Sequence, residues 1–163
     1  MNETGVFLSL GSNLGDREGF IAGALEALDR ACVSVDRRSC IYETEPEGVE
    51  NQPWFLNQVV HATTSLAPLE LLEACKRIER VFGREPAGVR FGPRTLDIDI
   101  LLYGDQVRAD TRLTLPHPRM HERRFVLKPL VEIAPTLLDP RSGQEYAQVL
   151  ERLGEGKKVQ DRR

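Results

Sequence analysis

The chain has 163 residues, of which 40% are hydrophobic and 29% are charged, and its net charge is -3. This size and composition suit one globular domain and exclude a disordered chain. The net acidity argues against a nucleic-acid-binding protein, because such proteins usually carry a basic excess.

The cysteines, Cys32, Cys40 and Cys75, are odd in number and form no CxxC pair. They predict neither a disulfide framework nor a zinc site, and they fit a reducing compartment. The first residues contain no basic segment followed by a long apolar run, and no stretch of the chain approaches the length of a membrane span. We therefore expect a cytoplasmic protein with no membrane attachment.

The first half of the chain alternates between apolar runs and turn-forming residues. Residues 6–10 predict a strand that ends in a Gly-Ser-Asn turn. Asp16 precedes a helical pattern whose apolar residues share one face. Residues 35–42 and 55–64 predict two further strands, separated by the loop 43–53.

In the second half, Pro68 opens a helix that Gly83 ends, and a breaker-rich loop runs from there to residue 95. Residues 96–103 are the clearest strand, and residues 106–109 are expected to pair back on it. Helices follow near residues 125–133 and 146–153.

The order of these elements predicts an α+β fold with a ferredoxin-like βαββαβ core, a mainly antiparallel sheet packed by helices, and C-terminal additions. One domain is expected over residues 1–163, with residues 155–163 as a frayed polar tail.

Asp97 and Asp99 are two residues apart on a predicted strand, so their side chains point to the same face. Two adjacent acids repel each other, and Asp is unfavourable in strands. A magnesium ion would offset that cost, because it takes one or two carboxylates and completes its shell with water and phosphate oxygens. From spacing alone, a metal site and a solvated strand face are equally good interpretations.

Arginines surround this strand, and arginine suits bidentate contact with phosphate. They are Arg84, Arg90, Arg94, Arg108, Arg112, Arg119, Arg123 and Arg124. Paired acids and several arginines are the parts of a phosphoryl-transfer site. The alternative is a set of surface ion pairs, which contribute little.

Two further patterns are less specific. The segment 11–17 follows a strand but lacks the Gly-Lys-Ser/Thr ending of a P-loop, so a tight turn with a helix cap is the better interpretation. Phe55 and Asn57 share one face of a strand, where they could stack and read a flat heterocycle. A core Phe with a satisfied Asn is the commoner arrangement.

Three ordered blocks resemble the 6-hydroxymethyl-7,8-dihydropterin pyrophosphokinase family. They are LSLGSNLGD at 8–16, GPRTLDIDI at 92–100, and LPHPRM at 115–120 followed by RRFVL at 123–127. The resemblance spans nearly the whole chain. It implies transfer of diphosphate from ATP to the hydroxymethyl group of the dihydropterin, with release of AMP.

The resemblance also implies two magnesium ions, ligated by Asp97 and Asp99, and phosphate contacts from Arg84 and Arg94. The residues it places at ATP are Lys76, Ile100, Arg112, Thr114, His117 and Arg123. The residues it places at the pterin are Thr44, Gly48, Phe55, Asn57 and Phe125. The loop 84–91 resembles a mobile lid that carries Arg90 and Phe91. ATP and the pterin are the expected partners, with no nucleic acid, and a monomer is expected.

Several positions depart from the best-known members of the family. Phe91 replaces a Trp, Phe55 and Pro118 replace Tyr residues, Ala87 replaces a Lys and Lys76 replaces a Gln. Glu45 and Glu47 are acidic departures in the pterin loop. Two alternatives stay open: another magnesium-dependent phosphoryl transferase, and a non-catalytic ferredoxin-like binding module.

Overall fold

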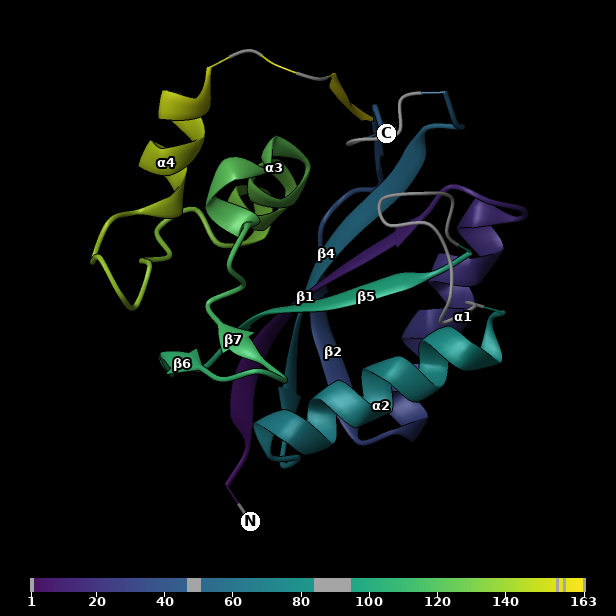
Figure 1. Cartoon of the computed structure of the whole chain (residues 1–163), viewed down its shortest axis with the longest axis horizontal. Helices are drawn as coiled ribbons and strands as arrows, with labels where there is room; N and C mark the ends of the chain where they lie inside the picture. Colours follow the sequence, from purple (N-terminus) through teal and green to yellow (C-terminus); the bar gives the residue numbers. More distant parts are fainter. Residues whose placement is uncertain (1, 47–50, 84–94, 155, 157, 163) are drawn as a thin grey trace.

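The computed structural model describes residues 2–46, 51–83, 95–154, 156 and 158–162 of the chain. Its strands are β1 (Thr4–Ser12), β2 (Val33–Arg38), β3 (Tyr42–Thr44), β4 (Phe55–Thr64), β5 (Asp97–Tyr103), β6 (Arg108–Ala109), β7 (Thr114–Leu115) and β8 (Val159–Asp161). Its helices are α1 (Arg17–Arg30), α2 (Pro68–Val81), the short 3₁₀ helix η1 (Met120–Glu122), α3 (Arg124–Ile133) and α4 (Tyr146–Leu153). Figure 1 shows their arrangement.

The main sheet has the order β5-β1-β4-β3-β8, and β2 also pairs with β4. Every pairing in it is antiparallel. The connection through α1 therefore joins parallel strands on either side of β4, and the connection through α2 joins parallel strands on either side of β1. This is the ferredoxin-like βαββαβ arrangement, and the predicted fold class is confirmed.

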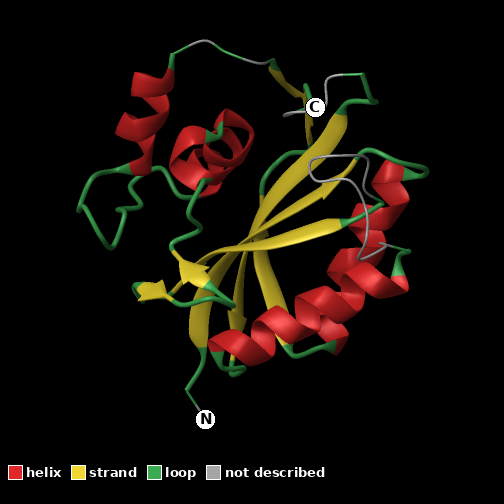
Figure 2. Cartoon of the chain, in the orientation of Figure 1, coloured by secondary structure: helices red, strands yellow, loops and turns green. Residues whose placement is uncertain are grey.

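Helices cover the two faces of the sheet (Figure 2). On one face, α1 and α2 pack on a core that includes Leu8, Leu10 and Ile98. On the other face, α3 and α4 pack on Phe7, Val59 and other apolar residues. No helix among the described residues is long and apolar enough to cross a membrane.

The predicted strand 35–42 is wrong as a single element, because β2 ends at Arg38 and β3 begins at Tyr42. Ser39 interrupts it with side-chain and backbone hydrogen bonds. Its Oγ accepts from the Val59 N–H at 3.0 Å, and its carbonyl accepts from Gln58 Nε2 at 2.7 Å. These bonds replace a regular ladder, and β2 already carries an irregularity after Val35.

The pairing expected for residues 106–109 is also wrong: β6 pairs with β7 in a separate two-stranded sheet. The carboxylate of Asp110 accepts from the N–H groups of Arg112 and Leu113, both at 2.9 Å. This Asx-type turn reverses the chain at residue 110, so the partner of β6 follows it in sequence.

The C-terminal tail differs from the expected frayed segment, because β8 pairs with β3. Without β8, one edge of β3 would have N–H and C=O groups with no partner strand. β8 provides hydrogen-bond partners along that edge. The helix boundaries follow the sequence signals more closely. Asp16 caps α1 by accepting from the Gly19 N–H at 3.1 Å, and Gly83, with φ of 91°, follows α2.

Candidate functional site

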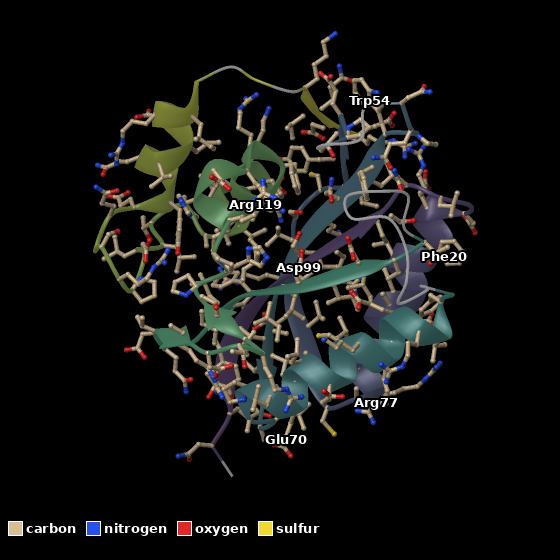
Figure 3. All side chains as sticks on the ribbon, in the orientation of Figure 1. Phe20, Trp54, Glu70, Arg77, Asp99 and Arg119 are labelled. Atoms are coloured by element: carbon tan, nitrogen blue, oxygen red, sulfur yellow. The ribbon has the colours of Figure 1, made fainter. Side chains whose placement is uncertain are left out.

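Asp97 and Asp99 lie on one face of β5, as strand alternation predicts. In the ladder with β1, Asp97 is opposite Gly11 and Asp99 is opposite Ser9. Both aspartates are half-buried, whereas Ile98 between them packs into the core under α2. Figure 3 shows Asp99 at the centre of the molecule, where β5 crosses the view. The strand therefore presents two neighbouring carboxylates on the face opposite to α2.

A third carboxylate, from α2, forms a hydrogen bond with the backbone of this strand. Glu79 on α2 is 7% exposed, and its Oε2 accepts a hydrogen bond from the Ile98 N–H at 2.8 Å. This bond holds the peptide between the two aspartates. Glu79 falls within the helix predicted to begin at Pro68, and an acid on its apolar face is the sequence signal that could have found this role.

Cys75 lies one turn before Glu79 on α2 and is buried. Burial raises the pKa of its thiol to about 12, and the charges of Glu79 and Asp99 add to the shift. The thiol is therefore protonated at neutral pH and does not act as a nucleophile.

Asn57 lies on β4 with a fixed side chain. Its Nδ2 donates to Thr44 Oγ1 at 2.6 Å, and the two residues are 4% and 1% exposed. Gly11 pairs with both Asp97 and Asn57 from its place on β1. A Cβ atom at Gly11 would lie 2.8 Å from Asn57 Oδ1, so a larger residue would displace the amide. Glycine thus leaves room between the acidic pair and the amide.

The ring of Phe55 comes from the same face of β4 as Asn57, and Phe55 pairs with Thr44 of β3 in register. It is half-buried. Residues Asn57, Thr44 and Phe55 are therefore brought together, as the resemblance implies.

Phe125 and Arg123 come to this edge from the start of α3. The Arg123 guanidinium carbon lies 5.5 Å from the centre of the Phe125 ring. Both residues, with Thr44, line a cavity of about 220 Å³. α3 is anchored to β3 here, because the hydroxyl of Tyr42 donates to Glu132 Oε1 at 2.6 Å. Burial and this bond raise the pKa of Tyr42 above its ordinary value.

The residues expected at ATP fall into two groups. Arg112 pairs with Glu73 of α2 at 2.6 Å, and Lys76 is exposed one turn further along the same helix. Thr114 begins β7 and is half-buried, while Ile100 is part of the core under α2. This group lies around α2 and the β6-β7 turn.

His117 belongs to the second group, with Arg123, on the α3 side of the sheet. Its N–H donates to the Leu101 carbonyl at 2.9 Å, and its Nδ1 accepts from the Arg119 N–H at 3.1 Å. Because Nδ1 accepts, the neutral ring carries its proton on Nε2. His117 can therefore donate one hydrogen bond from Nε2.

The N-terminal block has a role that the sequence reasoning missed. Asp16 caps a helix as expected, but Asn13 Nδ2 donates to Gln52 Oε1 at 2.8 Å and to the Pro53 carbonyl at 2.9 Å. Arg17 donates to the Trp54 carbonyl at 3.0 Å. These bonds hold the chain just before Phe55. Asn13 is 1% exposed, and its two bonds reach residues 39 and 40 positions away, so no local pattern in the sequence signals this role.

Five residues of the expected site lie outside the described residues: Gly48, Arg84, Arg90, Phe91 and Arg94. Within the described ranges, no group of three or more His, Cys, Asp or Glu side chains could hold a metal ion. Asp97 and Asp99, which share one face of β5, are a donor set that fits a cation taking two carboxylates and filling its other positions with water and phosphate oxygens, as magnesium does.

A ferredoxin-like sheet that carries paired carboxylates beside a fixed amide and aromatic rings defines a candidate site for a small-molecule transferase. The model of the family described as 7,8-dihydro-6-hydroxymethylpterin-pyrophosphokinase (HPPK) matches residues 7–135. The chain belongs to this family.

Some of its relatives are of similar length, and others are much longer proteins that match this chain over only part of their length. A 2-amino-4-hydroxy-6-hydroxymethyldihydropteridine pyrophosphokinase of Bacillus subtilis is 50% identical over 128 residues, which are 78% of this chain and 76% of that protein. A folate synthesis bifunctional protein of Arabidopsis thaliana is 47% identical and is covered over 27% of its length, against 80% of this chain. The chain thus spans about a quarter of that longer relative.

Solved structures agree on the fold. A crystal structure of an HPPK-DHPS in complex with substrates matches with a TM-score of 0.74 at 14% identity, over 93% of this chain and 43% of that chain. A Plasmodium falciparum HPPK-DHPS with pteroate matches with a TM-score of 0.73 at 16% identity. At such low identity, these matches establish the fold alone.

Proposed function

We propose that this chain transfers diphosphate from ATP to the hydroxymethyl group of 6-hydroxymethyl-7,8-dihydropterin and releases AMP, in folate biosynthesis. The observation that carries the proposal is the row Asp97, Gly11, Asn57 across three adjacent strands. It sets a carboxylate pair for a metal-bound triphosphate beside an amide that can read a heterocycle, with a glycine between them. Family membership supports the same assignment.

In this reaction the substrate hydroxyl oxygen attacks the β-phosphorus of ATP in line. A new oxygen-phosphorus bond forms, the bond from the β-phosphorus to the α,β-bridging oxygen breaks, and AMP leaves with that oxygen. The hydroxyl proton passes to solvent. Asp97 and Asp99 would hold magnesium, which neutralises charge on the triphosphate oxygens when it is bound. The protein's own contribution is to position the two substrates.

On the pterin side, Asn57 and Thr44 orient the ring edge, while Phe55 and Phe125 stack on its faces. The bond from Asn57 Nδ2 to Thr44 Oγ1 supports this assignment, because it fixes the amide before substrate binds. Gly48 is assigned to the same ring by the family resemblance.

On the ATP side, the proposed residues are Lys76, Ile100, Arg112, Thr114, His117 and Arg123. The bond from the Arg119 N–H to Nδ1 supports the assignment of His117, because the tautomer that accepts at Nδ1 carries its proton on Nε2, a donor suited to a phosphate oxygen. The resemblance also assigns phosphate contacts to Arg84 and Arg94, and a lid role to Arg90 and Phe91.

The test is to mix protein, ATP, magnesium and the hydroxymethyl pterin and to separate the nucleotides by chromatography. AMP and the pterin diphosphate should appear in equal amounts. ADP alone would indicate a different phosphoryl transferase, and ATP binding without turnover would indicate a binding module. Calorimetry with the pterin separates these outcomes further, because only the proposed enzyme should bind it.

We also propose two magnesium ions, a single domain, a monomer and a cytoplasmic location. The family resemblance implies the count of two ions, and Asp97 and Asp99 are the residues that would hold them. Titration of manganese into the protein with a non-hydrolysable ATP analogue, followed by electron paramagnetic resonance, counts the ions. Light scattering of the purified protein tests the oligomeric state.

A further inference from the structure

The C-terminal strand β8 lies outside the residues that the family model matches, yet it forms an edge of the main sheet. It pairs with β3, where Val159 is opposite Thr44 and Asp161 is opposite Tyr42. Figure 1 shows the end of the chain beside the strands of the main sheet rather than away from them. The strand that carries Thr44 therefore lies between β4 and the C-terminal segment.

The pairing continues past Thr44 toward the pterin loop. The Glu45 N–H donates to the Lys158 carbonyl at 3.1 Å, and the Lys158 N–H donates to Glu45 Oε1 at 2.7 Å. The acidic departure at Glu45 thus serves to bind the C-terminal segment. These two bonds restrain the chain at the point where it enters the loop.

Other contacts attach the segment to three elements. Arg162 pairs with Glu18 of α1 at 2.9 Å and with Glu43 of β3 at 3.7 Å. Lys128 of α3 donates to the Val159 carbonyl at 3.3 Å. Exposed ion pairs contribute little alone, so the backbone ladder is the main restraint.

The segment also forms one wall of the cavity of about 220 Å³ described above. Lys158 and Val159 of the segment line it together with Leu153 of α4, Thr44 and Phe125. Two residues proposed to contact the pterin therefore share a cavity with the C-terminal segment.

We propose that β8 is a positioning element for the pterin side of the site, holding β3 and Glu45 in place before the substrate binds. The inference rests on the proposed function. β3 has only three residues, and ordering a segment of the chain costs conformational entropy. Pairing with β8 offsets this cost in the folded chain, before the substrate binds. A site ordered in advance binds more tightly, because less freedom is lost on binding. Of the residues proposed at ATP, Arg123 lines this cavity, whereas Lys76, Arg112 and Thr114 lie around α2 and the β6-β7 turn. We therefore expect ATP binding to depend much less on β8 than pterin binding does.

A proline in β8 tests the backbone role. The Arg162 N–H donates to the Ile41 carbonyl, and the Glu45 N–H donates to the Lys158 carbonyl, so antiparallel alternation also directs the N–H of Gln160 toward β3. Gln160→Pro removes that donor, whereas Gln160→Ala keeps it and changes only an exposed side chain. A variant lacking residues 159–163 removes the strand altogether.

Calorimetry should show pterin binding weakened about tenfold in Gln160→Pro and in the deletion, the scale expected from loss of pre-organisation. Binding of an ATP analogue with magnesium should change less than about twofold. General damage to the fold would instead weaken the binding of both ligands to a similar extent. Gln160→Ala should match the unaltered chain. Equal pterin binding in all four proteins, or equal losses for pterin and nucleotide, would overturn the proposal.

Amide hydrogen exchange gives a measurement that needs no substrate. Thr44 and Glu45 should exchange faster in Gln160→Pro than in Gln160→Ala, whereas β1 and β5 should be unchanged. Unchanged exchange at Thr44 and Glu45 would overturn the positioning role even if the enzyme is active. If the unaltered chain binds no pterin, the proposed function fails, and the exchange experiment still decides whether β8 orders β3.

Discussion

Glu79 offers the sharpest test of how the acidic pair is held. Its carboxylate accepts the Ile98 N–H at 2.8 Å from the face of the sheet opposite to Asp97 and Asp99. Glu79→Ala removes the acceptor and leaves a space under β5, whereas Glu79→Gln keeps the volume and one acceptor oxygen. The two substitutions therefore separate the shape of the side chain from its charge.

The magnitudes follow from burial. A buried N–H group left without its acceptor costs about 1–3 kcal/mol. Removing buried side-chain atoms adds a cavity cost, so Glu79→Ala should lower the free energy of unfolding by about 2–4 kcal/mol. Glu79→Gln exchanges a charged acceptor for a neutral one and should cost about 1 kcal/mol. Displacement of the acidic pair in Glu79→Ala should lower kcat by about 10- to 100-fold.

The assay measures denaturant unfolding, AMP formation and the dependence of the rate on magnesium concentration. Glu70→Gln is the matched control on the same helix, because Glu70 is exposed and accepts from the Ala67 N–H at the helix start. It should alter stability by less than about 1 kcal/mol and leave kcat unchanged. If Glu79→Ala is destabilised while its kcat and magnesium dependence match the unaltered chain, Glu79 is only a packing residue and the positioning argument fails.

Three further predictions address the site and its surroundings. Asp97→Asn or Asp99→Asn should lower AMP formation at least about 1000-fold and abolish magnesium-dependent nucleotide binding, and near-normal rates in both would remove the metal role. Asn57→Ala should weaken pterin binding about tenfold or more, with nucleotide binding unchanged in calorimetry, because the amide lies on the pterin side. Cys75 should resist a thiol reagent at pH 8 while the exposed Cys32 reacts, and stability should fall as the pH rises from about 9 to about 12, because the folded pKa of Cys75 is raised and only its protonated form favours folding. Equal labelling of both thiols in the native protein, or stability unchanged over that pH range, would contradict the buried environment of Cys75.

The parts of the fold that the sequence predicted are those set by local periodicity. The alternation in residues 96–103 predicted both the strand β5 and the common face of Asp97 and Asp99, because a strand has a fixed two-residue period. The caps of α1 and the start of α2 at Pro68 were also predictable, since they depend on neighbours within one turn. The resemblance supplied the identity of the substrates, which periodicity does not contain.

The parts that were missed depend on contacts between distant residues. The bond from Asn13 to the Pro53 carbonyl spans 40 positions, and the pairing of β8 with β3 spans more than 100. No window of neighbouring residues reveals such contacts. The interruption at Ser39 belongs to the same class, because its partners lie on β4. Local propensity favoured a continuous strand, and tertiary hydrogen bonds decided otherwise.

One irregularity explains why the carboxylate pair sits at its place on β5. The ladder between β1 and β5 shifts register between Phe7 and Leu8, so Leu101 and Leu102 both pack with α3 and α4. On the Asp97 side of this shift the side chains alternate strictly. Ile98 and Ile100 pack into the core under α2, and Asp97 and Asp99 point to the other face. A polar pair placed beyond the shift would meet the apolar residues under α3, at the cost of burying charge. The end of the strand before the shift is thus the part of β5 that can present two carboxylates to a solvated ligand while the rest of the strand stays in the core.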